Sequence, residues 1–221
     1  MLNIILFIIE ILIFGTILYL ISKKDRKELL IFFIVALTVI TNVMIIKKMD
    51  ILGFEIPLGI ASYVAIFNTC NILNQKYGKE DQYKVLSLIT ITSGITYLFL
   101  LLSGLTTVNS VNANTNIAYN NIFDMNFMNF LIFTTITIIS LLINYSLYFK
   151  IRKSKNKIWL SNILSSSIIY IIDTIFYVIL ININNLDITR IIITIMFIYL
   201  FKIITSCFYT LINVKVCKLE K

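Results

Sequence analysis

Residues 159–183 read WLSNILSSSIIYIIDTIFYVILINI, an almost wholly apolar stretch that carries an aspartate, Asp173, near its middle. Because a helix rises about 1.5 Å per residue, about 20 apolar residues cross the hydrocarbon core of a bilayer. A carboxylate at that depth costs about 2.5–3.5 kcal/mol on insertion scales. Such residues usually face the interior of a helix bundle and pair with one another. The stretch therefore predicts a transmembrane helix whose aspartate faces a polar interior.

The composition extends this prediction to the whole chain of 221 residues, which is 59% hydrophobic and only 14% charged. A soluble domain is usually about 45–50% apolar and about 25% charged. The apolar runs are near 20 residues long and do not alternate with polar residues, whereas strands of a membrane barrel would alternate over about ten residues. We therefore expect an all-α fold, a polytopic integral membrane helix bundle.

The expected membrane segments lie at about residues 1–21, 29–46, 58–75, 85–103, 127–149, 159–183 and 191–214. The first lacks the basic start and the cleavage site of a signal peptide, so we interpret it as a membrane helix. The only proline, Pro57, comes just before a helical run and predicts a turn between the second and third segments. Residues 104–126 are polar and of low complexity, so no regular structure is assigned to them.

The basic residues predict the orientation of the bundle. Of the 19 Lys and Arg residues, all but Lys47, Lys48, Arg190 and Lys202 lie in residues 22–28, 76–84, 150–158 and 215–221. These ranges fall on alternate sides of the predicted segments, and basic loops stay in the cytoplasm. We therefore expect the N-terminus outside and the C-terminus in the cytoplasm. The net charge of +8 then reports membrane topology, and no nucleic-acid partner is expected.

Polar side chains recur at helical spacing in several segments. Residues three, four or seven apart share one face of a helix, and this spacing links Thr38 to Thr41 and Asn42, Asn68 to Asn71 and Gln75, and Ser166 to Tyr170 and Asp173. Amides both donate and accept hydrogen bonds, so they can bind the edge of a planar heterocycle. They can equally join neighbouring helices without a ligand. Both interpretations stay open at this point.

Lys202 is the strongest candidate partner of Asp173. It lies 12 residues from Arg190 and 13 from Lys215, too deep in its segment to reach either membrane surface easily. An ion pair with Asp173 could be purely structural and fix the register of two helices. Intramembrane charges more often mark a transport pathway, so we expect a functional pair.

Other chemistry is largely excluded by what the sequence lacks. It contains no histidine, which is the commonest general base and metal ligand, and its three cysteines show no paired spacing. We therefore expect no enzymatic activity, no metal and no cofactor.

Three blocks resemble the vitamin-uptake-transporter-like (VUT) family, also called queuosine precursor transporters. They are ITNVMIIKKMDILGFEIPLG (40–59) running into NILNQKYGKED (71–81), WLSNILSSSIIYIIDTIFYVIL (159–180) and YLFKIITSCFYTLINV (199–214). The resemblance covers roughly residues 30–215. It implies about six core transmembrane helices within a transporter domain, residues 29–221, preceded by an extra N-terminal helix and loop, residues 1–28. It also implies a bacterial inner-membrane importer of deazaguanine bases or queuine.

Individual residues carry this resemblance. Asp173 and Lys202 match the intramembrane Asp and Lys of the family, and Tyr77 and Gly78 match its turn. Asn71 stands where the family usually has an aspartate. The chain also has Gln75 where glutamate is common, Ile169 and Tyr170 for a Ser/Gln pair, and Thr210-Leu211 for a Thr-Pro. Because an amide cannot bind a proton or a cationic amine as a carboxylate does, we expect a neutral base rather than an aminomethyl cation.

The leading hypothesis is an importer of a small planar base, with the lipid bilayer and this solute as partners and homo-oligomerisation left open. The predicted substrate-binding residues are Asn42, Asn68, Asn71, Gln75, Ser166, Tyr170, Asp173 and Lys202. In this hypothesis Asn71, Gln75 and Asp173 bind the edge of the base, and Tyr170 or Tyr177 stacks on its face. The alternatives are a substrate-binding membrane subunit of an ATP-driven vitamin-type importer and a non-transporting accessory membrane protein.

Overall fold

The computed structural model describes residues 2–45, 47–51, 53–78, 81–104, 127–155, 157–181 and 187–218. Within these ranges the chain forms seven helices and one β-hairpin. The elements in chain order are α1 (Leu2–Lys23), α2 (Lys27–Met44), β1 (Lys48–Ile51), β2 (Phe54–Pro57), α3 (Ile60–Tyr77), α4 (Gln82–Gly104), α6 (Phe127–Lys155), α7 (Ile158–Ile181) and α8 (Ile188–Lys218).

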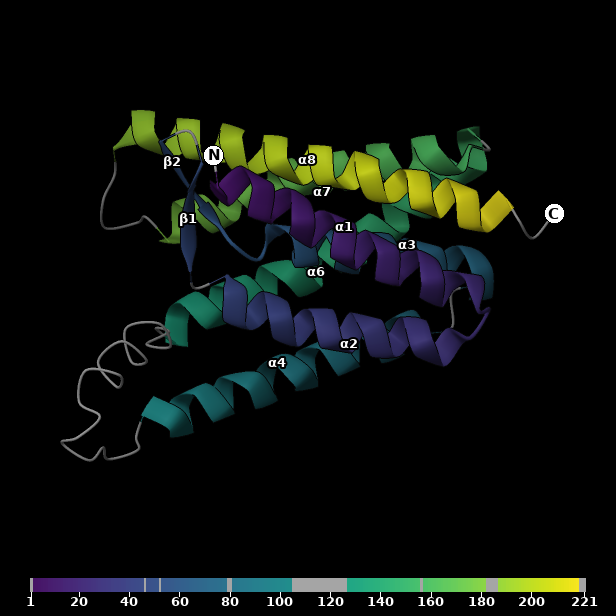
Figure 1. The fold of residues 1–221 in the computed structure, drawn as a ribbon, viewed down its shortest axis with the longest axis horizontal. Coiled ribbons are helices and arrows are strands. Elements are labelled where there is room, and N and C mark those ends of the chain that lie inside the picture. Colours follow the sequence, from purple (N-terminus) through teal and green to yellow (C-terminus); the bar gives the residue numbers. More distant parts are fainter. Residues whose placement is uncertain are drawn as a thin grey trace.

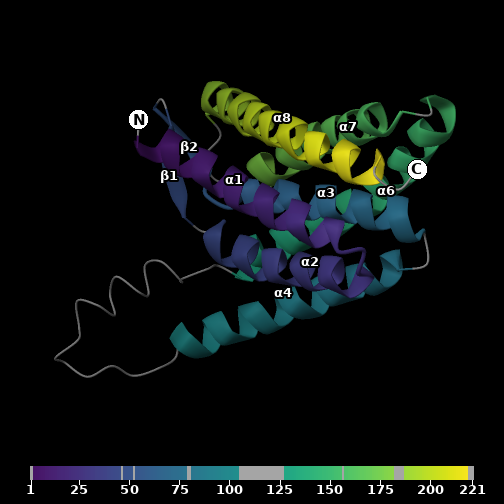
Figure 2. The ribbon, with the colours of Figure 1, turned by 45° about the vertical axis from the view of Figure 1, so that its right-hand side comes forward.

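The helices form one bundle with α7 and α8 along one side and α2 and α4 along the other (Figure 1). Between these pairs lie α1, α3 and α6, and the turned view keeps the same order (Figure 2). The N-terminus lies beside the hairpin, while the C-terminus lies at the opposite end of the bundle. The predicted all-α helix bundle is therefore confirmed.

Helix α3 is the centre of the bundle. It packs against α1, α2, α6, α7 and α8, and 14 of its 18 residues are buried. The other six helices are long and apolar enough to cross a membrane, whereas α3 is not among those candidates. Because protein rather than lipid surrounds α3, its amide and hydroxyl side chains can be satisfied by neighbouring helices. The predicted segment 58–75 thus forms a helix of the expected length that is enclosed by the others.

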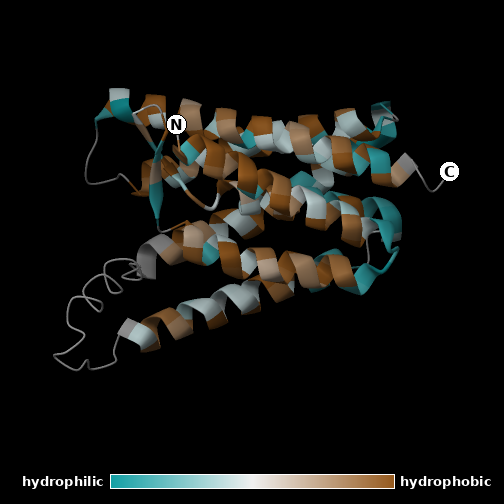
Figure 3. Cartoon of the chain, viewed as in Figure 1, coloured by the Kyte–Doolittle hydropathy of each residue, from teal (hydrophilic) through white to brown (hydrophobic). Residues whose placement is uncertain are grey.

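The outer surface of the bundle is apolar. Large side chains such as Phe32, Phe99 and Leu211 are about seven-tenths exposed, which is expected of helices that face hydrocarbon rather than water. Hydrophobic colour runs along the helices, and hydrophilic residues gather at the two ends of the bundle (Figure 3). Together with the six apolar helices, this surface makes the chain a multi-pass membrane protein.

Two predicted connections differ from the structure. The basic stretch 150–158, expected as a loop, continues α6 as far as Lys155, because Lys and Arg are good helix formers and favour a helix C-terminus. The expected turn before Pro57 is an antiparallel hairpin that pairs Lys48 with Pro57 and Ile51 with Phe54. Gly53 supplies the positive φ of 84° that its tight turn needs. The proposed polar loop at 104–126 lies, apart from its first residue, outside the described residues.

Contacts from both sides hold the hairpin over one end of the bundle. Asn3 of α1 donates to the Asp50 carbonyl at 2.6 Å. The Phe54 ring stacks on Phe197 of α8 with 3.7 Å between ring centroids. Glu55 lies 3.9 Å from Arg190 of α8, so the hairpin joins the first helix to the last.

Helix α1 packs closely on α8 through a glycine. A side chain at Gly15 would place its Cβ only 2.8 Å from the ring of Phe208. Small residues of this kind let membrane helices approach closely, which increases their van der Waals contact. Helix α1 is therefore an integral part of the bundle.

The opposite end of the bundle is closed by polar contacts between turns. The Tyr77 hydroxyl donates to Asp25 at 2.7 Å, and Lys76 lies 3.6 Å from the same carboxylate. The Tyr77 hydrogen bond, followed by the charge of Lys76, lowers the pKa of Asp25 below its usual value. A second ion pair joins Lys27 to Asp81, so the α1–α2 turn is tied to the segment between α3 and α4.

Candidate functional site

The predicted pair of Asp173 and Lys202 forms within the bundle. The Lys202 ammonium donates to Asp173 Oδ1 at 2.8 Å and to the Thr174 hydroxyl at 3.0 Å. Thr174 in turn donates to Asp173 Oδ1 at 3.1 Å. The side chains of Asp173 and Lys202 are 1% and 9% exposed. Each side chain loses its water on burial and gains the opposite charge as a partner. This pairing lowers the free-energy cost of placing both charges in the membrane interior.

Tyr63 of α3 completes this cluster and was not among the predicted site residues. Its hydroxyl donates to the second carboxylate oxygen, Asp173 Oδ2, at 2.6 Å. The Lys202 ammonium lies 4.7 Å from the centroid of the Tyr63 ring and 5.7 Å from that of Tyr170, within the range of cation–π attraction. Three helices thus meet at one carboxylate.

A small cavity adjoins the ion pair at the hairpin end of the bundle. It has a volume of about 20 Å³, room for roughly one water molecule. Aromatic rings, aliphatic side chains and the two charges share its wall, which consists of Ile45, Pro57, Gly59, Ile60, Tyr63, Phe133, Ile136, Asp173, Tyr177, Ile198 and Lys202. The structure therefore shows a closed form, in which a larger solute enters only after the walls separate.

Three buried hydroxyls lie within two helical turns of the ion pair, on its side away from the hairpin. They belong to Ser166 and Tyr170 of α7 and Ser206 of α8, which neighbour one another. In the described part of the chain, none of the three makes a hydrogen bond of acceptable geometry. Buried polar groups are normally paired with protein, water or ligand. The three hydroxyls lie within reach of one another and form a polar group beside the ion pair.

An amide cluster joins α3, α6 and α7 in the middle of the bundle. Asn71 donates to Asn162 and accepts from Asn144 at 3.0 Å. Asn162 donates to Asn68 at 2.6 Å and to the Thr210 hydroxyl at 2.5 Å. Asn68 and Asn71 are fully buried. Their bonds to Asn144 and Asn162 run between helices, while Asn68 also donates to the Val64 carbonyl of its own helix at 3.1 Å. In this closed form Asn68 and Asn71 join neighbouring helices. This is the structural one of the two interpretations that the sequence had left open.

The remaining predicted residues lie apart from Asp173. Gln75 accepts from the Tyr148 hydroxyl at 3.0 Å and from Arg152 at 3.4 Å. It lies 12 residues beyond Tyr63 on α3, about 18 Å along the helix axis. Asn42 donates to Ser93 of α4 at 3.0 Å. In this conformation the structure does not bring Gln75 and Asp173 together, and the binding of one base edge by Asn71, Gln75 and Asp173 stays a prediction.

Sequence reasoning missed the contributions of Tyr63, Asn144 and Asn162 to these clusters. Asn162 and Asn144 do lie on polar stripes of their own helices, and that signal alone could have included them. Tyr63 belongs to no such stripe, because it stands among apolar residues at the start of α3. Among the residues that the structure describes, no group of His, Cys, Asp and Glu side chains could hold a metal ion.

A family model described as "Putative vitamin uptake transporter" matches residues 57–216. The chain belongs to this family. The match covers α3 to α8 and so includes Tyr63, Asp173 and Lys202. No curated protein and no solved structure matches the chain. Membership of the vitamin uptake transporter family, together with the six apolar helices, identifies the chain as a multi-pass membrane protein of the vitamin-uptake type.

Proposed function

We propose that this transporter imports a small, neutral, planar base, a deazaguanine precursor of queuosine or queuine itself. The observation that carries the proposal is the buried Asp173–Lys202 pair beneath Tyr63, at the wall of a cavity between α3, α6, α7 and α8. The family match supports uptake of a small solute. The choice of a base rests on the chemistry of the cavity and on the resemblance of the sequence blocks.

The cavity offers complementary groups for such a base. Asp173 accepts hydrogen bonds and Lys202 donates them, so an edge with adjacent donors and acceptors can bind across the pair. The rings of Tyr63, Tyr170 and Tyr177 surround this position, and aromatic rings stack favourably on flat heterocycles. The pair is neutral as a whole, which favours a solute without net charge.

Transport requires the closed form to open alternately to the two sides of the membrane. Binding a base would replace some contacts between Asp173, Lys202 and Tyr63 with contacts to the solute. Loosening these contacts would release α3 from α7 and α8. The solute would then bind the closed and the open conformation with different affinities, and a ligand can shift an equilibrium only through such a difference. We propose that the hairpin side is the outside, with the C-terminus in the cytoplasm, in agreement with the basic turns at the opposite end.

The proposal is tested in bacterial cells that can neither make nor import queuosine precursors. The chain is expressed in these cells, 7-deazaguanine derivatives are supplied, and queuosine in tRNA is measured. Modified tRNA is expected with the wild-type chain and not with an empty vector. If no derivative restores queuosine although the protein reaches the membrane, the substrate assignment is wrong.

A further inference from the structure

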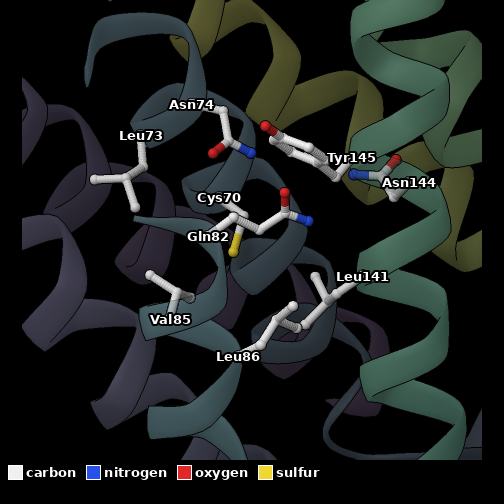
Figure 4. A pocket seen from close by; sticks show the side chains of 9 residues that line it. All are labelled: Cys70, Leu73, Asn74, Gln82, Val85, Leu86, Leu141, Asn144 and Tyr145. Carbon is white, nitrogen blue, oxygen red and sulfur yellow. The ribbon is translucent and has the colours of Figure 1, made fainter. Parts of the chain in front are cut away.

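A second cavity lies near the other end of α3, between α3, α4 and α6. It is lined by Cys70, Leu73, Asn74, Gln82, Val85, Leu86, Leu141, Asn144 and Tyr145 (Figure 4). Its volume is about 20 Å³, close to that of the cavity beside the ion pair. Asn74 follows Tyr63 by 11 residues, which places the two cavities about 16 Å apart along the axis of α3.

The amide side chains of this second cavity are largely buried. Asn74 and Gln82 are only 5% and 8% exposed, and within the described residues neither side-chain amide makes a hydrogen bond. The Asn144 side-chain oxygen is fully buried and also lacks a described partner. Figure 4 shows the amides of Asn74 and Gln82 and the Tyr145 hydroxyl pointing toward one another. An unpaired buried polar group costs about 1–3 kcal/mol, so this arrangement suits a site that a ligand or water completes.

The chemistry of the wall defines the class of ligand. No charged side chain lines this cavity, in contrast to the cavity beside Asp173 and Lys202. Three amides supply both donors and acceptors, Tyr145 adds a ring and a hydroxyl, and leucine and valine side chains supply apolar contact. A neutral heterocycle with a hydrogen-bonding edge fits these groups, whereas a cation or an anion would find no counter-charge.

The amide cluster of Asn68, Asn71, Asn144 and Asn162 adjoins the second cavity, and along α3 its residues Asn68 and Asn71 lie between Tyr63 of the first cavity and Asn74 of the second. Asn144 belongs to both features, because its amide nitrogen donates to Asn71 and the residue also lines the cavity. A change in the hydrogen bonds of Asn144 on binding a ligand would therefore reach the cluster that holds α3, α6 and α7 together.

We propose that the cavity of Asn74, Gln82 and Asn144 is a second binding site for the transported solute, reached from the end opposite the hairpin. This inference rests on the proposed function for the identity of the solute. A neutral base leaving the ion pair would cross the amide cluster and bind here before release. The solute would then bind first at the site with charged groups and next at the site with amides alone.

Cys70 makes the site directly testable because it lines the cavity. Both other cysteines, Cys207 and Cys217, are free thiols elsewhere on α8 and can be changed to serine. In this C207S/C217S protein, alkylation of Cys70 by N-ethylmaleimide is followed with and without 7-deazaguanine. At about ten times its Kd, the base should slow alkylation about tenfold. Asn74→Leu and Gln82→Leu should each raise the concentration needed for this protection by about tenfold.

Two further variants separate this site from the ion pair and from a general effect. Ser87→Ala, an exposed change on α4, should leave protection unchanged. Asp173→Asn should weaken binding beside the ion pair and leave protection of Cys70 in place. The inference is overturned if the base gives no protection, or if protection is lost in Asp173→Asn and retained in Asn74→Leu.

Equilibrium dialysis decides the same question if Cys70 resists alkylation in the free protein. Tritiated 7-deazaguanine should bind in Asp173→Asn but not in the double variant of Asn74→Leu with Asp173→Asn. Equal binding by these two proteins contradicts the inference. Uptake of the base is measured separately. Uptake without binding at Asn74 contradicts only the second site, whereas binding at Asn74 without uptake contradicts only the proposed import function.

Discussion

The Lys202 ammonium lies 2.8 Å from Asp173 Oδ1 although the two residues are 29 positions apart in the sequence. The bond joins α7 to α8, and the Tyr63 hydroxyl joins α3 to the same carboxylate at 2.6 Å. The pair therefore links the central helix to the two C-terminal helices at the wall of the cavity where we propose that the solute binds.

Removing one member of the pair should destabilise the bundle more than removing both. Asp173→Asn or Lys202→Met alone leaves a buried polar or charged group without its partner, which costs about 3–5 kcal/mol. The double variant leaves no unpaired charge, so its loss should be clearly smaller than the sum of the two. Unfolding of the purified proteins by denaturant measures these changes in the free energy of unfolding.

The control for this cycle is Lys153→Met, because Lys153 is an exposed lysine in the last turn of α6. It should change the free energy of unfolding by less than about 0.5 kcal/mol. Additive effects of Asp173→Asn and Lys202→Met would mean that the two side chains do not interact energetically.

Asn162→Leu should weaken the amide cluster in the middle of the bundle. The change removes the bonds of Asn162 to Asn68, Asn71 and Thr210 while keeping a similar side-chain volume. Because orphaned buried groups cost about 1–3 kcal/mol and membrane hydrogen bonds average about 0.6 kcal/mol, the expected loss is about 2 kcal/mol. Thermal unfolding should show a lower Tm. Leu164→Ala, a change at a more exposed position of α7, is the control, and an equal effect of the two changes would contradict the cluster's role.

The turn between α1 and α2 should loosen in acid. Tyr77, then Lys76, lowers the pKa of Asp25 from its usual value of 3.8. A group with a lowered folded-state pKa stabilises the folded state above its unfolded pKa and loses this effect as the pH falls through the folded value. Hydrogen exchange of residues 24–26, corrected for intrinsic rates, should therefore accelerate below about pH 3.8.

Asp25→Asn is the matched variant for this acid effect. Asparagine tolerates the positive φ of 48° at this position but carries no titratable charge. The corrected exchange rates of the variant should be higher than in the wild type at neutral pH and should not change further in acid. The same acid response in both proteins would show that Asp25 is not responsible.

Fusions at the two ends of the bundle test its orientation. A green fluorescent protein after residue 221 should fluoresce, because the positive-inside rule places that end in the cytoplasm. Alkaline phosphatase inserted at the tip of the hairpin, after Gly53, should be active, because this enzyme needs the oxidising outer side. The reverse pattern would overturn the proposed orientation and with it the direction of the two sites.

Hydropathy predicted the helices well because the bilayer fixes their length. All seven segments appear within a few residues of their expected places, apart from the extensions of α6 and α8 beyond the apolar region. The ion pair was predictable for an energetic reason, because Asp173 and Lys202 lie too deep to remain unpaired. The hairpin was missed because its two strands of four residues are short, and the sequence predicted only a turn, from Pro57.

Helical spacing predicted which side chains share a face but not how deep each lies relative to another helix. Asn68, Asn71 and Gln75 do share a face of α3, yet Gln75 binds Tyr148 and Arg152 of α6. Tyr63 meets Asp173 near the other end of α3. The depth at which α3 crosses α7 depends on tertiary packing, which a single sequence does not report.

The central claim is that the cavity of Asp173, Lys202 and Tyr63 binds a neutral planar base. Thermal unfolding of the purified protein with increasing 7-deazaguanine tests it most directly, because a ligand that binds the folded state raises its Tm. We expect a saturable increase, with the apparent Kd raised about tenfold by Tyr63→Phe and left unchanged by Tyr83→Phe, a highly exposed tyrosine. No increase with 7-deazaguanine or its derivatives, or the same Kd in Tyr63→Phe as in the wild type, would contradict the claim.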